Sequence, residues 1–224
     1  MNSHRPGVRF AAAIQVVLFM TMGIGPVAST QDETDYGSQR HAMVSKQIER
    51  RGVEDKLVTA AMRQVPRHLF VPAVQRRLAY SDHPLAIGYG QTISQPYIVA
   101  YMCQIARLDS NSRVLEVGTG SGYHAAIMAR IADTVHTIEI IPQLAVNAEN
   151  THTSLGYGNI VVHTGDGYYG IPHAAPFDAI VVTAAAEHIP PPLLEQLAEG
   201  GRMIIPIGHP FLVQYLVLVK KEAG

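Results

Sequence analysis

Three glycines directly after a short apolar run are the most informative feature of this 224-residue chain. The run Val114–Val117 leads into Gly118, Gly120 and Gly122, and a helix-forming stretch, 123–131, follows at once. Glycine has no Cβ, so it lets a ligand approach the backbone, and the free N–H groups at the start of a helix point toward that ligand. The pattern therefore predicts a ligand-binding loop between a strand and a helix.

Acidic residues at three expected strand ends indicate what the ligand carries. We place Glu116, Glu139 and Asp166 at the carboxyl ends of the first three strands, where ligands bind in open α/β sheets. Glu139 lies 21 residues after Gly118, the position from which a carboxylate binds ribose hydroxyls. Asp166 can accept a hydrogen bond from an exocyclic amine such as that of adenine. Glu139 and Asp166 together favour a ligand that contains adenosine.

The spacing of the glycines distinguishes between adenosine ligands. Dinucleotide sites use the pattern G-x-G-x-x-G, whereas residues 118–122 read G-x-G-x-G, and no Arg or Lys stands near to meet a pyrophosphate. S-adenosylmethionine carries a positive charge and no phosphate, so it fits this loop better. The alternative is that the glycines make only a tight turn and the acidic residues only cap helices.

Cysteine and histidine give no comparable pattern. The single cysteine, Cys103, lies in the apolar run 98–105, which favours a buried structural thiol over a nucleophile. The histidines lack metal-ligand spacing and no H-E-x-x-H motif occurs, so we expect no bound metal. Seventeen Lys and Arg residues balance eighteen Asp and Glu residues, and the resulting net charge of −1 argues against a nucleic-acid partner.

The elements that must position these residues alternate between helix and strand. A hydrophobic content of 47% is enough to bury a sizeable core. Runs that are apolar at consecutive positions, such as Ala179–Val182, are typical of parallel strands covered on both faces. We therefore expect an α/β fold with a doubly wound, mostly parallel sheet. The expected helices are 97–107, 122–132, 142–155 and 190–198, and the expected strands are 113–117, 134–139, 159–163, 177–183, 201–207 and 213–219.

The first part of the chain divides into three segments. Residues 1–29 contain Arg5, Arg9 and the apolar run 10–22, and they look like an export signal. An uncleaved membrane anchor and a misassigned start codon are the alternatives. Residues 30–40 are polar and are predicted to be a linker. Residues 41–97 are predicted to hold N-terminal helices and a turn-rich functional loop, and 98–224 the ligand-binding α/β domain; we expect 41–224 to form one compact unit.

The same residues carry a family resemblance. Val114–Gly122, continuing through Ala126, resembles motif I of the class I methyltransferases, and the block Asp82–Pro96 resembles one subgroup specifically, the protein-L-isoaspartate O-methyltransferases. Further matches are Val65–His68 with Phe70–Pro72, Gly165–Gly167, Val182–Ala186 with Pro190, and Gly200–Arg202 with Ile205–Gly208. The resemblance covers about residues 40–219. It implies a Rossmann-like methyltransferase fold with an N-terminal helical extension.

The resemblance also implies an activity and the residues that carry it. The enzyme would move a methyl group from S-adenosyl-L-methionine to the α-carboxyl of L-isoaspartyl residues in damaged proteins and peptides, with Ser94 placed at the reacting carboxylate. The cofactor would contact Glu116, Gly118, Thr119, Gly120, Ser121, Gly122, Glu139, Asp166, Gly167 and Thr183. The peptide would lie against Ile87, Gly88, Gly90, Gln91, Thr92, Ile93 and Gln95.

Several alternatives stay open on the sequence alone. A small-molecule methyltransferase would share residues 114–186 but would not need the block 82–96. A non-catalytic exported binding protein, decayed from the enzyme, is a second alternative. The Asn/Asp-Pro-Pro-aromatic motif of base methyltransferases does not follow the strand 177–183, which argues further against nucleic acid. We expect a monomer, and we expect it in the cytoplasm because S-adenosylmethionine is made there; a working leader would instead place it in the periplasm.

Overall fold

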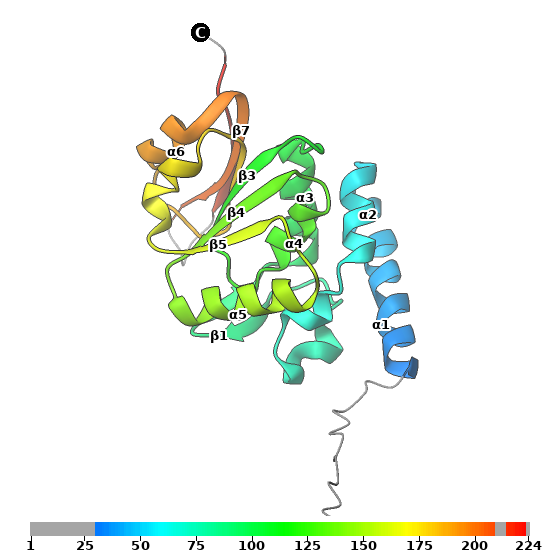
Figure 1. Cartoon of the computed structure of the whole chain (residues 1–224). Coiled ribbons are helices and arrows are strands. Elements are labelled where there is room, and N and C mark those ends of the chain that lie inside the picture. Colours follow the sequence, from blue (N-terminus) through cyan, green and yellow to red (C-terminus); the bar gives the residue numbers. More distant parts are fainter. Residues whose placement is uncertain (1–29, 209–213, 223–224) are drawn as a thin grey trace, which may run out of the picture.

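A six-stranded sheet forms the centre of the protein (Figure 1). The computed structural model describes residues 30–208 and 214–222. The strand order is β5-β4-β3-β6-β7-β8; β3 to β7 are parallel and β8 runs antiparallel to β7. The strands are β3 (Arg113–Val117), β4 (Thr134–Glu139), β5 (Ile160–Thr164), β6 (Phe177–Val182), β7 (Leu197–Ile207) and β8 (Tyr215–Lys220). This order confirms the doubly wound, mostly parallel sheet that the sequence predicted.

Helices cover both faces of the sheet because its central strands are apolar on both faces. Figure 1 shows α3 (Pro96–Ala106) and α4 (Tyr123–Ala129) on one side of the strands and α6 (Pro191–Gln196) on the other. The long helix α5 (Pro142–Ser154) packs against β4 and the edge strand β5. The side of α6 is completed by the short helices η5 (Gly167–Tyr169) and η6 (Pro172–Ala174).

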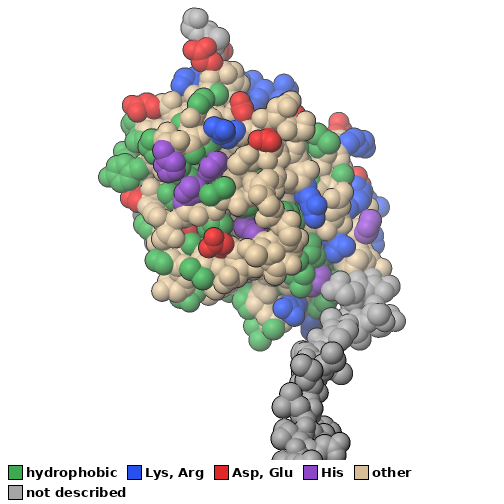
Figure 2. Space-filling model, viewed as in Figure 1, with side chains coloured by type: hydrophobic (Ala, Val, Ile, Leu, Met, Phe, Trp, Pro, Cys, Tyr) green, Lys and Arg blue, Asp and Glu red, His purple; other side chains and the backbone are tan. Residues whose placement is uncertain are grey.

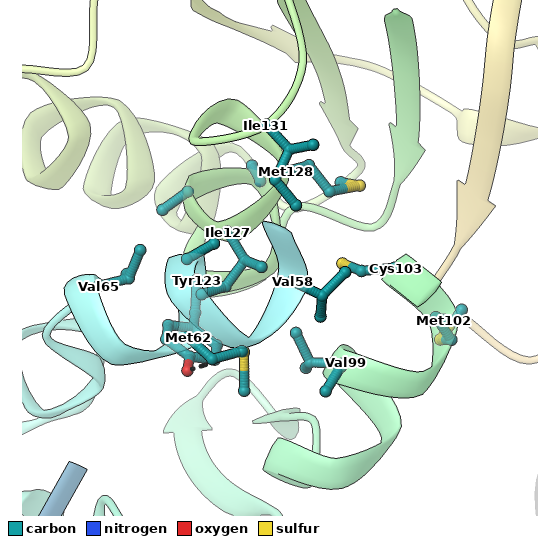
Figure 3. Close-up of a cluster of buried hydrophobic side chains, with 14 of the residues drawn as sticks. Val58, Met62, Val65, Val99, Met102, Cys103, Tyr123, Ile127, Met128 and Ile131 are labelled. Atoms are coloured by element: carbon teal, nitrogen blue, oxygen red, sulfur yellow. Dashed lines mark hydrogen bonds between the residues drawn. The ribbon is translucent and has the colours of Figure 1, made fainter. Parts of the chain in front are cut away.

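The N-terminal helices share their core with the sheet. Side chains of α2 (Lys56–Gln64), α3 and α4 point toward one another in one buried cluster, in which Met62, Cys103 and Ile127 take part (Figure 3). The same cluster includes Val114 of β3 and Ile204 of β7. Cys103 is fully buried, as the sequence predicted. We infer that the helical extension folds together with the α/β part.

The predicted linker 30–40 is wrong, because α1 (Thr30–Met43) occupies this segment. The sequence there is polar, but tertiary contacts hold the helix in place. The ring of Tyr36 stacks on His68 at 4.1 Å, and Arg40 Nε donates to the Arg63 carbonyl at 2.6 Å. After α1 the chain continues through the short helices η1 (Val44–Ile48) and η2 (Glu49–Arg51). This helical segment ends at Gly52, whose φ of +88° favours glycine. The leader-like segment 1–29 lies outside the described residues.

The turn-rich segment Tyr80–Gln95 contains a β-hairpin. β1 (Leu85–Gly88) pairs antiparallel with β2 (Gln91–Ile93), and the turn has positive φ at Gly88, Tyr89 and Gly90. Leu85 and Ile93 anchor the hairpin in the core. Before it come η3 (Arg67–Phe70) and η4 (Ala73–Leu78). No helix among residues 30–208 and 214–222 is long and apolar enough to cross a membrane. On the face of the molecule shown in Figure 2, Lys and Arg side chains lie interspersed with Asp and Glu side chains.

Candidate active site

A cavity of about 540 Å³ lies at the carboxyl ends of the parallel strands. The ends of β3, β4 and β6 and the turn after β5 form its floor, and β2 of the hairpin forms one wall. The parallel pairing brings Glu116 beside Thr137 and Val181, so residues from distant parts of the chain meet here. Glu116, Glu139 and Asp166 all line this one cavity, as expected from the strand ends.

The glycine loop takes a backbone conformation that glycine alone adopts readily. Gly118, Gly120 and Gly122 have φ values of +97°, +53° and +81°. Gly118 N donates to the Ile138 carbonyl at 2.9 Å, which ties the loop to the neighbouring strand. A Cβ at Gly118 would collide with Thr183 Oγ1. The loop therefore needs glycine both for its φ angles and for its close approach to β6.

Thr183 holds the loop from the side of β6. Its N–H donates to the Val117 carbonyl at 2.9 Å, and its Oγ1 donates to the Gly118 carbonyl at 2.7 Å. Gly122 forms the start of α4 and does not line the cavity, whereas Gly118, Thr119, Gly120, Ser121, Gly167 and Thr183 do. The structure thus gathers these predicted cofactor residues, except Gly122, around one space.

Glu139 supports the loop and faces the cavity at the same time. Its Oε2 accepts from Gly120 N at 2.8 Å and its Oε1 accepts from Ile141 N at 3.0 Å. Each carboxylate oxygen has a second lone pair, so these two bonds leave acceptor capacity for ligand hydroxyls. The capping role that the sequence left as an alternative and a ligand-binding role are therefore compatible at Glu139.

Glu116 is a buried carboxyl group with one oxygen unused. Its Oε2 accepts from Thr137 Oγ1 at 2.6 Å, and Thr137 in turn lies 2.6 Å from Thr119 Oγ1. Oε1 has no hydrogen-bond partner among the described residues. Burial raises the pKa of Glu116 to about 8, and the charge of Glu139 adds to this, whereas the bond from Thr137 opposes it. A cationic donor from the cavity side would satisfy this carboxyl group.

The acidic side chains of the cavity suit a cationic ligand, and none of the described side chains that line it is a Lys or Arg that could pair with a phosphate group. Four acidic residues line the cavity: Glu116, Glu139, Asp166 and Glu187. Asp166 is exposed at the rim, and its Oδ1 caps η5 by accepting from Tyr168 N at 2.9 Å. The described residues hold no group of three or more His, Cys, Asp or Glu side chains that could bind a metal. The glycine loop, the buried Glu116 carboxyl with one oxygen unpaired among the described residues and the acidic lining fit S-adenosylmethionine.

Ser94 directly follows β2 of the hairpin and lines the same cavity as the glycine loop. It is half-buried, and it lines the cavity together with Gln91, Thr92 and Ile93. Four other predicted substrate residues do not line this cavity. Ile87 borders a second, smaller cavity of about 210 Å³ beside Gly120 and Ser121, and Gln95 Nε2 donates to the Asp82 carbonyl at 3.0 Å. Gly88 and Gly90 lie in the turn of the hairpin.

Sequence reasoning missed part of the lining. Ile140, Tyr168 and Glu187 border the cavity, and each directly follows or closely follows a strand end that the sequence had identified. Ile140 is 65% exposed although it is apolar, which is consistent with a surface for a flat ligand ring. The available signal was closeness in sequence to a predicted site residue, which was Glu139 for Ile140, Asp166 for Tyr168 and Thr183 for Glu187.

The fold and this site define a class I methyltransferase that uses S-adenosyl-L-methionine. The sequence profile of the family described as "Protein-L-isoaspartate(D-aspartate) O-methyltransferase" matches residues 38–224. The chain is 52% identical over 209 residues to a protein-L-isoaspartate O-methyltransferase of Opitutus terrae, covering 93% of this chain and 88% of that protein. It is 54% identical over 220 residues to "Protein-L-isoaspartate O-methyltransferase 2" of Syntrophobacter fumaroxidans, covering 94% and 88%.

Two solved structures extend the likeness to three dimensions. One protein-L-isoaspartate O-methyltransferase has a TM-score of 0.73 and 32% identity over 83% of this chain, which spans 60% of that chain's length. A putative protein-L-isoaspartate O-methyltransferase of Plasmodium falciparum, in complex with S-adenosyl-L-homocysteine, has a TM-score of 0.71 and 28% identity, covering 82% and 90%. The chain belongs to the protein-L-isoaspartate (D-aspartate) O-methyltransferase family, and is a transferase that repairs isoaspartyl residues with S-adenosyl-L-methionine as methyl donor.

The contact between Gly118 and Thr183 generates a first prediction. Gly118→Ala should weaken binding of S-adenosylhomocysteine at least about tenfold, because the new Cβ displaces Thr183 and the strained φ costs about 1 to 3 kcal/mol. Gly156→Ala is the matched control, since Gly156 also has positive φ but has open space around its Cβ position. Calorimetric titration of both variants measures the effect. Equal cofactor affinity in the two variants would contradict the role of the close contact.

The raised pKa of Glu116 predicts how stability depends on pH. The folded protein binds this proton more tightly than the unfolded chain does, so Glu116 lowers stability progressively as pH rises from 4.5 to about 8. Glu116→Gln, which resembles the protonated acid, should be relatively more stable than the wild type at pH 8 than at pH 5. Urea unfolding at both pH values tests this, with Glu54→Gln, an exposed acid, as the control. Parallel pH profiles for wild type and Glu116→Gln would refute it.

Proposed function

We propose that Ser94 orients the α-carboxylate of the L-isoaspartyl substrate for methyl transfer inside the 540 Å³ cavity. The observation that carries this proposal is that Ser94, which follows the hairpin, and the glycine loop, which follows β3 of the six-stranded sheet, line the same space. A serine hydroxyl can donate one hydrogen bond to a carboxylate oxygen, and a bond to a charged acceptor is stronger than a neutral one. The hydroxyl would thereby fix the direction of the attacking oxygen.

The reaction depends more on the position of the substrate carboxylate relative to the methyl group than on proton transfer. A carboxyl group with an ordinary pKa near 4 is already ionised at neutral pH, so no general base is needed. When bound, S-adenosyl-L-methionine supplies an electrophilic methyl group on a positively charged sulfur. The residues of this chain then contribute by holding the carboxylate in line with that group and by excluding water. The lining is compatible with this mechanism, because it contains no Lys or Arg of the described residues that would form an ion pair with the reacting carboxylate.

The hairpin supplies a wall for an extended peptide. β1 and β2 form a two-stranded sheet of their own, separate from the six-stranded sheet. The proposed substrate residues Ile87, Gly88, Gly90, Gln91, Thr92, Ile93 and Gln95 lie on this hairpin or directly after it. Backbone groups of a short hairpin can pair with a peptide independently of its side chains. This mode of binding supports acceptance of isoaspartyl sites in many sequence contexts.

We propose further that the active unit is a monomer in the cytoplasm. This proposal is supported by the fact that the glycine loop, the acidic strand ends and Ser94 of a single copy already line one cavity. The location follows from the cofactor, which is made in the cytoplasm. We also retain the proposed division into residues 41–97, with the helices and the hairpin, and 98–224, with the cofactor site.

Replacement of Ser94 tests the proposed chemistry. Ser94→Ala should lower kcat for an isoaspartyl peptide roughly 10- to 100-fold, because a hydrogen bond to a charged group contributes about 1.5 to 3 kcal/mol. The affinity for S-adenosylhomocysteine should stay within about twofold, since no cofactor contact is removed. Transfer of radiolabelled methyl groups measures kcat, with the matching aspartyl peptide as substrate control. Ser154→Ala, at an exposed serine of α5, is the control variant. A loss of cofactor affinity as large as the loss of kcat would rule out the assigned role.

The proposed location has its own test. Alkaline phosphatase, which is active only after export, should remain inactive when fused behind residues 1–40 in a bacterial host. A fusion behind residues 30–40 alone supplies the baseline, and a fusion behind a known signal peptide supplies the upper limit. Activity near the upper limit would place the protein outside the cytoplasm and overturn this part of the proposal.

A further inference from the structure

Arg67 is a completely buried arginine between the substrate hairpin and the cofactor loop. Its relative exposure is 0%, and it begins η3. Its Nε donates to the Ala79 carbonyl at 2.8 Å, and its Nη2 donates to the Ser94 carbonyl at 2.8 Å. A single guanidinium group therefore binds two backbone carbonyls that are 15 residues apart in the sequence.

These two carbonyls flank the hairpin that carries most of the proposed substrate residues. Residues 80–93, which lie between them, contain both strands of the hairpin. The guanidinium closes this segment at its base, and one of the two closing points is Ser94 itself. The planar fork of arginine has donors at fixed angles, so it sets the distance between the two ends more firmly than two independent contacts would.

The same guanidinium lies against the cofactor side of the site. Its carbon is 4.8 Å from the centre of the Tyr123 ring, a distance that permits a cation–π contact. Tyr123 is the first residue of α4, directly after the glycine loop, and it lines the cavity. Arg67 thus contacts both parts of the chain that must be aligned for methyl transfer.

A contribution to the stability of the fold does not by itself explain why the charged side chain of Arg67 is buried here. Arg67 takes part in neither of the two ion pairs formed by the described residues, and its Nη1 is buried without an acceptor. Burial lowers the pKa of Arg67 to about 10, so the group still carries its charge at neutral pH. Buried charges that lack a full set of partners often cost more than an apolar side chain of similar volume.

We propose that Arg67 is a positioning residue of the active site, which fixes Ser94 relative to the cofactor loop by closing the segment 80–93 at its base. This inference rests on the proposed role of Ser94. Arg67 does not line the cavity, and it acts through the backbone of Ser94 and the ring of Tyr123.

Two variants at Arg67 and one control provide the first part of the test. Arg67→Met removes the charge and both bonds at similar volume, and Arg67→Lys keeps the charge but cannot reproduce the fork. Arg67→Met should lower kcat about tenfold and Arg67→Lys by an intermediate factor, with binding of S-adenosylhomocysteine within about twofold of wild type. Arg40→Met is the control, because Arg40 binds Tyr80 and Arg63 in the same region but does not contact Ser94. Wild-type kcat in a folded Arg67→Met or Arg67→Lys protein would overturn the inference.

A double-mutant cycle with Ser94→Ala separates positioning from a general structural effect. Ser94→Ala keeps the carbonyl that Arg67 binds, so only the hydroxyl is lost. If Arg67 acts through Ser94, the Arg67 substitution should lower kcat less than about twofold in the Ser94→Ala background. Losses that multiply would overturn the role of Arg67 while leaving that of Ser94 intact. An unchanged kcat in Ser94→Ala alone would instead refute the proposed function of Ser94, and the inference with it. If Arg67→Met does not fold, Arg67→Lys completes the same cycle.

Discussion

Backbone hydrogen bonds between the ends of neighbouring parallel strands are the constraint on which the site depends. The Ile138 carbonyl at the end of β4 accepts from Gly118 N, and the Val117 carbonyl at the end of β3 accepts from Thr183 N. These bonds continue the sheet pairing into the loops, so three strand ends are held in one register. Because the chain turns sharply there, only residues without Cβ fit beside Thr183. The shape of the cavity follows from this local geometry.

Charged groups of opposite sign lie at two different places around the site. The cavity itself is lined by acidic side chains and suits a cation, whereas the substrate brings a carboxylate. No Lys or Arg of the described residues lines the cavity, and the Ser94 carbonyl accepts a hydrogen bond from the buried Arg67. A positive group held behind the backbone can orient the serine without forming an ion pair with the carboxylate, which would make that carboxylate less nucleophilic.

The parts of the molecule that sequence reasoning predicted are those set by local rules. β3, β4 and α5 matched the expected ranges within one residue, because their apolar runs and their turn residues lie next to each other in the chain. The predictions failed where contacts between residues far apart in the sequence determine the local structure. The helix over residues 30–43 is held by His68 and Arg63, and the hairpin in the loop 80–95 is anchored in the core by Leu85 and Ile93. A polar segment or a glycine-rich turn shows none of these partners in its own sequence.

The same distinction applies to the active site. The glycine loop and its acidic neighbours could be identified from spacing, since the backbone geometry and the ligand chemistry both act over a few residues. Ser94 could be identified only by resemblance, because nothing in its own neighbourhood gives a lone serine in a loop a catalytic role. Its position depends on Arg67, 27 residues earlier, through a contact between a side chain and a carbonyl. Every residue has a backbone carbonyl, whatever its type. A hydrogen bond to that carbonyl therefore cannot be detected from the spacing or composition of the sequence.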